Sequence, residues 1–102
     1  MRVELAAKAE NDLRDIALFI AADNPARAIG FYEELEAACL ELAKFPERFQ
    51  VINSSEGMEI RRRVYGKYVI LYSVFKIRIV VLRVVRGSIN LNALFNESDP
   101  EI

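Results

Sequence analysis

Residues 58–90 read MEIRRRVYGKYVILYSVFKIRIVVLRVVRGSIN. Three runs within this segment are rich in Val, Ile, Leu and Tyr, residue types that favour strands. Only YGK (65–67) and FK (75–76) separate the runs. Connections this short join neighbouring strands as hairpins. We therefore expect three antiparallel strands, at residues 58–64, 68–74 and 77–85.

Two helices are expected before these strands. Apolar residues recur every three to four positions from Leu13 to Ile20, with charged residues between them, which is typical of an amphipathic helix ending near Ala22. In DNP (23–25) the first two residues can cap a new helix, and Pro25 suits its first turn. The second helix is expected to run for about 20 residues and to stop at Pro46. Its apolar positions at helical spacing are Phe31, Leu35, Ala38, Leu42 and Phe45, the first four of them expected in the core.

The remaining segments complete a two-layer α+β domain. RVEL (2–5) alternates polar and apolar residues and is expected to form an N-terminal edge strand, whereas residues 46–57 have no clear period and are expected to form a surface loop. An antiparallel helical hairpin then packs on one face of a mainly antiparallel sheet of three or four strands. In this chain of 102 residues we expect a single domain over 1–95, followed by an acidic tail at 96–102.

Charge is distributed unevenly along the chain. Residues 58–90 contain eight Lys or Arg and one Glu, whereas residues 1–57 contain six basic and eleven acidic residues. The net charge of −1 therefore conceals a basic strand region joined to an acidic helical region. Such an arrangement favours a surface that binds an anionic partner, either an acidic peptide or a nucleic acid.

The composition excludes several classes of site. The chain has no histidine, which removes the commonest general base and most transition-metal sites, and its four glycines form no phosphate-binding motif. Its one cysteine, Cys39, lies on an apolar stripe and is expected to be a small core residue. No apolar run approaches the roughly 20 residues of a membrane helix, and the N-terminus does not resemble a signal peptide. We therefore expect a cytoplasmic protein.

The predicted strands are apolar on both faces, although one helical hairpin can cover only one face of a small sheet. Three readings of the second face remain open at this point. The C-terminal residues Leu91, Leu94 and Phe95, or a second copy of the chain, could cover it. A separate chain could instead bring acidic groups to Arg62, Arg83 and Arg86, or RNA could bind through arginines and the nearby Tyr65, Tyr68 and Tyr72.

The order of these motifs resembles a known family. AENDLRDIALFIAADNPARAIGFYEEL (9–35), LAKFPE (42–47), IRRRVYGKYVILYSV (60–74) and IVVLRVVRGSIN (79–90) look like a ParE-type toxin of the ParE/RelE superfamily. The resemblance implies the toxin component of a type II toxin-antitoxin system. It also implies a ParD-like antitoxin, whose acidic and partly disordered segment folds around the toxin. ParE-like members are understood to inhibit DNA gyrase without a catalytic centre of their own.

The RelE-like relatives offer an alternative, because they cut mRNA in the ribosome with basic residues and often a late Tyr or His. Here Arg86 stands where many members carry His, no tyrosine follows Tyr72, and Asn90 stands where Asp is frequent. An arginine is too basic to exchange protons readily near neutral pH, so a proton donor is lacking. We therefore favour the non-enzymatic reading, with no metal, cofactor, membrane, small-molecule substrate or nucleic acid bound directly. The residues expected to contact the antitoxin or target are Arg61, Arg62, Arg63, Tyr65, Arg83 and Arg86.

Overall fold

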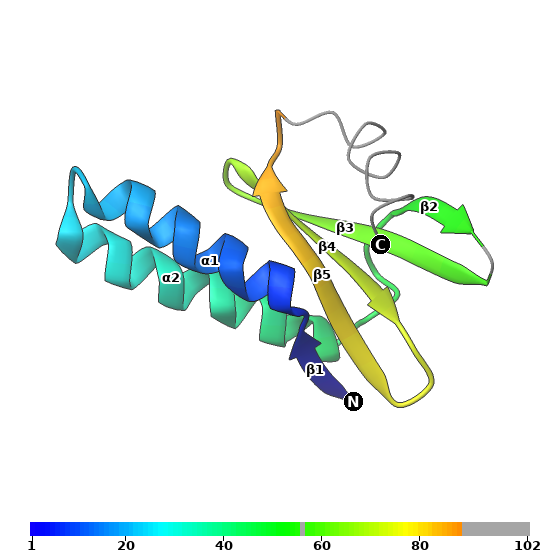
Figure 1. Ribbon diagram of the computed structural model, residues 1–102. Coiled ribbons are helices and arrows are strands. Elements are labelled where there is room, and N and C mark those ends of the chain that lie inside the picture. Colours follow the sequence, from blue (N-terminus) through cyan, green and yellow to red (C-terminus); the bar gives the residue numbers. More distant parts are fainter. Residues whose placement is uncertain (56, 89–102) are drawn as a thin grey trace.

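The computed structural model describes residues 1–55 and 57–88, and it confirms the two-layer α+β architecture (Figure 1). Strand β1 (Arg2–Leu5) leads into α1 (Ala7–Ala21) and α2 (Pro25–Leu40). The chain then forms a short 3₁₀ helix, η1 (Glu41–Ala43), followed by β2 (Val51–Ser55), β3 (Met58–Tyr65), β4 (Tyr68–Val74) and β5 (Arg78–Arg86). The sheet order is β1-β5-β4-β3-β2, with β1 parallel to β5 and every other pair antiparallel.

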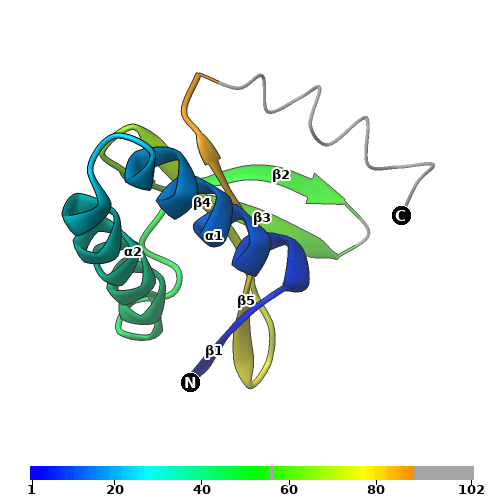
Figure 2. The same ribbon diagram turned by 60° about the vertical axis from the view of Figure 1, so that its left-hand side comes forward.

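The helical hairpin lies against one face of the sheet, and its turn extends past the strands (Figures 1 and 2). As expected, the turn is set by local chemistry: the Asn24 side chain accepts a hydrogen bond of 3.1 Å from the Arg27 amide, and Pro25 opens α2. α2 ends at Leu40, earlier than predicted, and the chain tightens into η1 before Pro46. Phe45 therefore lies outside the helix, and 65% of it is exposed.

A strand was not expected within residues 46–57. The structure forms β2 there, pairing antiparallel with β3 through an irregularity between Val51 and Asn53. Asn and Ser are poor strand formers, so this strand depends on its neighbour rather than on intrinsic propensity. The sheet consequently has five strands, where three or four were predicted.

Two apolar clusters flank the central strand β4, which is buried along most of its length. On the helix side, Leu13 and Leu35 pack with Ile70, Tyr72 and other residues of the strands. The second cluster joins Ile60, Val69, Leu71 and Val85. Both faces are thus buried, as the sequence pattern required. The proposed cover by Leu91, Leu94 and Phe95, the boundary at residue 95 and the acidic tail all lie outside the described residues.

Strand β5 contains a bulge that changes which side chains share a face. Tyr72 pairs with Val81 but its neighbour Leu71 pairs with Arg83, so Leu82 is the extra residue. β1 pairs with β5 only as far as Val81, and α1 then lies along the edge of β5. Just past the bulge, Arg83 pairs with Leu71 of β4 and its side chain reaches Asp12 of α1.

Candidate functional site

The six predicted contact residues do not form one cluster. In the pairing of β3 with β4, Arg61 and Arg63 stand opposite Tyr72 and Ile70, on the face that the helices cover. Arg62 stands opposite Leu71, on the other face. Alternation along the strand therefore separates the three consecutive arginines, as expected.

Arg61 and Arg63 hold the segment that follows α2. The Arg61 guanidinium donates to the backbone carbonyl oxygens of Glu47, at 3.0 Å, and Phe49, at 2.7 Å. Arg63 donates to the Ala38 carbonyl at 2.7 Å and pairs with Glu41 at 3.0 Å. Because both side chains are mostly buried, their main role in the described structure is to fix this segment against the sheet.

Arg83 has a partner within the same chain. Its Nε and Nη2 atoms donate to the two carboxylate oxygens of Asp12 in α1, at 2.8 and 3.0 Å. The Val84 amide donates to the same carboxylate at 2.8 Å, so Asp12 also supplies a hydrogen-bond acceptor to a backbone amide of β5. The hydrogen bond from Arg83 to Asp12 raises the pKa of the guanidinium. α1 thus supplies a partner for a charge in this Val-rich strand, and the contact of Arg83 with an antitoxin or target stays a prediction.

Tyr65 belongs to a network between β3 and α2. Its hydroxyl donates to a carboxylate oxygen of Glu34 at 3.2 Å, and Glu34 also accepts from Arg27 at 2.9 Å. Loss of hydration raises the pKa of the Tyr65 hydroxyl, with the Glu34 charge acting in the same direction. The hydrogen bond from Arg27 lowers the pKa of the Glu34 carboxyl. The Tyr65 ring also packs near Phe31, with centroids 6.3 Å apart.

Arg62 and Arg86 differ from the other predicted arginines. Within residues 1–55 and 57–88, no carboxylate lies within ion-pair distance of either one. Arg86 is exposed at the end of β5, 5.8 Å above the Tyr68 ring, beside a small cavity of about 190 Å³ that Phe19 helps to line. Among the described residues, these two are therefore the predicted arginines without an ion-pair partner.

The cysteine and one central tyrosine are sheltered from water in the described structure. Burial raises the pKa of the Cys39 thiol to about 12. Tyr72 is buried and donates to the Pro46 carbonyl at 2.7 Å, and desolvation raises the pKa of its hydroxyl. In the described part of the chain no group of three acidic, Cys or His side chains is placed to hold a metal. Nor does any described helix have the length and hydrophobicity to cross a membrane.

An apolar groove that the sequence patterns did not indicate lies on the outer side of the helical hairpin. It has a volume of about 600 Å³ and lies between α1 and α2. Leu18 and Ile29 line it and are 62% and 68% exposed, while Arg14 and Glu33 stand among its polar lining residues. Leu18 lies off the apolar stripe of α1, and Ile29 precedes that of α2; these off-stripe positions were the available signal.

The comparisons with known proteins agree on one fold. A family model, described as the ParE toxin of the type II toxin-antitoxin system parDE, matches residues 3–91. Among solved structures, a chain of the chromosomal ParDE TA system from P. aeruginosa superimposes with a TM-score of 0.70 at 17% sequence identity. That similarity covers 84% of this chain and 95% of the other. No curated protein matches the chain.

Proposed function

Because the chain belongs to the ParE toxin family of type II toxin-antitoxin systems, we propose that a ParD-like antitoxin holds it inactive and that the released toxin inhibits DNA gyrase. Both partners act in the cytoplasm, which is where we place this protein. The observation that carries the proposal is the family match over residues 3–91. The two-layer fold is compatible with it, although fold alone does not identify a target.

The chemistry of the described residues supports a binding role over a catalytic one. A general acid or base needs a pKa near the working pH, and the chain has no histidine. Arg61, Arg63 and Arg83 are engaged by carbonyl or carboxylate oxygens of their own chain. These arginines therefore shape and stiffen the surface instead of meeting a phosphate.

Two features of the surface suit an antitoxin. The apolar groove between α1 and α2 fits the apolar side of an amphipathic helix, with Leu18 and Ile29 as contact points. Arg62 and Arg86 are suited to carboxylates of an acidic segment that continues from such a helix. The antitoxin in this proposal spans both the hairpin and the sheet.

The direct test is DNA supercoiling by purified bacterial gyrase, with the full-length toxin refolded free of antitoxin. We expect inhibition together with trapped cleaved DNA, and we expect added antitoxin to reverse both. Cleavage of ribosome-bound mRNA with gyrase unaffected would replace this proposal with the RelE-type alternative.

Antitoxin binding is tested separately by calorimetry. Arg62→Ala and Leu18→Ser should weaken binding, by about tenfold each if the two side chains contact the antitoxin. Lys76→Ala, on the hairpin between β4 and β5, is the matched exposed control and should leave affinity unchanged. Unchanged affinity in both test variants would place the antitoxin elsewhere.

A further inference from the structure

The segment after η1 presents an exposed aromatic side chain on a rigidly held backbone. Tyr72 donates to the Pro46 carbonyl, Arg61 binds the carbonyls of Glu47 and Phe49, and the Arg48 amide donates to the Phe45 carbonyl at 3.1 Å. These bonds anchor the segment from beneath, although it has no regular secondary structure. The Phe45 ring nevertheless stays largely in solvent.

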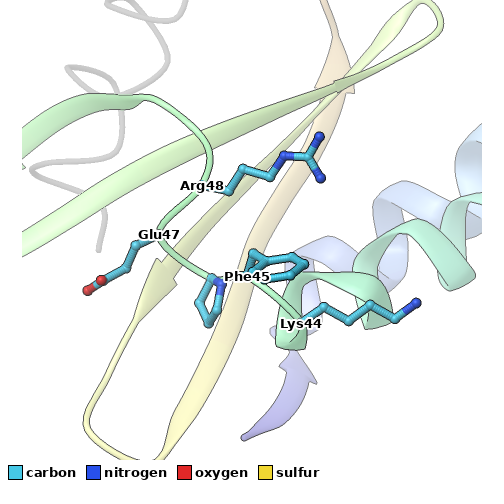
Figure 3. Close-up of a pocket in the computed structure, with 5 residues that line it drawn as sticks. Lys44, Phe45, Glu47 and Arg48 are labelled. Atoms are coloured by element: carbon cyan, nitrogen blue, oxygen red, sulfur yellow. The ribbon is translucent and has the colours of Figure 1, made fainter.

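Two adjoining hollows lie around this ring, and we call them together the Phe45 hollow. Figure 3 shows residues that line the first of them. The first, of about 520 Å³, is lined by residues 44–48. The second, of about 290 Å³, shares Lys44, Phe45 and Arg48 with the first and reaches Phe49 and Arg63. Figure 3 shows the Lys44 and Arg48 side chains extending toward the same side of the view, one below and one above the Phe45 ring.

The charges around the hollow are only partly balanced. Arg63 is paired with Glu41, but within the described ranges 1–55 and 57–88 no carboxylate lies within ion-pair distance of Lys44 or Arg48. Arg48 instead lies 5.5 Å from the centroid of the Phe49 ring. Two exposed cations beside an apolar ring complement a ligand that has carboxylates around an apolar group.

We propose that the Phe45 hollow binds an acidic peptide segment that carries one bulky apolar side chain. The apolar side chain packs against Phe45, and flanking carboxylates pair with Lys44 and Arg48. Because the backbone beneath is already fixed, binding orders little of the toxin, which favours affinity. The partner is defined by this chemistry and is independent of the antitoxin groove between α1 and α2.

The lining also decides between a peptide and a nucleic acid. Glu41 and Glu47 are among the lining residues. Glu41 is paired with Arg63 and the Glu47 side chain points away from Phe45 in Figure 3, but both negative charges still oppose a continuous run of phosphates. A peptide can place its few carboxylates at the two cations and leave the acidic side chains in water. An acidic peptide is therefore the better match.

The test uses the full-length protein and two short designed peptides, each labelled with a fluorophore. One carries a single leucine between Asp and Glu residues, and the other carries the same leucine between lysines. Only the acidic peptide should bind in fluorescence anisotropy, and it should shift the backbone amide NMR signals of residues 44–49. Phe45→Ala and Arg48→Glu should each weaken binding by about tenfold, the loss expected for a contact at the centre of an interface.

Phe75→Ala and Lys76→Glu are the matched controls, because both residues are exposed on the hairpin between β4 and β5 and line neither hollow. Each should bind the acidic peptide within about twofold of the parent chain, a difference well below one contact. Since all four substituted residues are exposed, folding is not at risk. Absence of acidic-peptide binding, equal loss in the controls, or preference for a single-stranded RNA oligonucleotide would overturn the proposal.

Discussion

The pair between Asp12 and Arg83 should be worth more to stability than its place at the sheet edge suggests. The Asp12 carboxylate is only 14% exposed and accepts three hydrogen bonds, two from Arg83 and one from the Val84 amide. Asp12→Ala removes all three hydrogen bonds and leaves a guanidinium and a buried amide without these partners. A lost partner costs about 1–3 kcal/mol for each sheltered polar group, so we expect a total near 3 kcal/mol.

Arg83→Ala should cost less, because Asp12 keeps its bond to Val84 and regains water. The Arg83 side chain is 30% exposed, so its two charged bonds should contribute only about 1.5 kcal/mol. In a double-mutant cycle the coupling free energy between Asp12 and Arg83 should be about 1–2 kcal/mol. A larger loss of unfolding free energy in Asp12→Ala than in Arg83→Ala is the specific signature of the hydrogen bond from the Val84 amide.

The assay is urea unfolding followed by far-ultraviolet circular dichroism, since the chain contains no tryptophan. The midpoints should shift while the slopes stay constant. Glu4→Ala is the matched control, because Glu4 pairs with Arg78 at 2.9 Å in a more exposed setting and should lose less than about 1 kcal/mol. If Arg83→Ala cost as much as Asp12→Ala, or if the coupling were near zero, the structural role assigned to this pair would be refuted.

Three further predictions concern other buried or paired groups. Cys39 should resist alkylation at about pH 8 in the folded protein, because its raised pKa of about 12 keeps the thiol protonated, and should react on unfolding. The Glu34 pKa should lie below its ordinary value in an NMR titration and should rise in Arg27→Ala. Because folding lowers this pKa, the pair stabilises the fold at pH values above the unfolded-state pKa, and the stabilisation is lost as the pH falls through the folded-state pKa. Tyr72→Phe should lower the free energy of unfolding by about 1–2 kcal/mol, measured in urea, because the Pro46 carbonyl loses its donor.

Most of the fold could be predicted, because it follows from local patterns. The helical turn depends on Asn24 and Pro25, and the hairpins depend on short connections between apolar runs. β2 could not be predicted, because a strand containing Asn53 and Ser54 forms only where β3 offers its edge. The early end of α2 was missed for a related reason: the apolar spacing continued to Phe45 after the helix had stopped at Leu40.

The candidate site was less predictable than the fold. The alternation along the strand predicted that Arg62 lies on the opposite face of the sheet from Arg61 and Arg63, and the register confirms this. The sequence pattern could not reveal that Arg61 donates to loop carbonyls or that Arg83 pairs with Asp12, 71 positions away along the chain. Such pairings depend on how α1 meets the edge of β5, and no periodicity encodes that contact.

The sequence alone determined the two helices, the strands joined by short hairpins, the basic strand region, the lack of histidine and the burial of Cys39, because each depends on composition or on short-range spacing. Packing settled which cations are paired within the described part of the chain. Arg83 is engaged by Asp12, while Arg62 and Arg86 have no carboxylate nearby among residues 1–55 and 57–88. The reason is physical: the strength of a charge pair depends on distance and burial, which exist only once distant segments have come together.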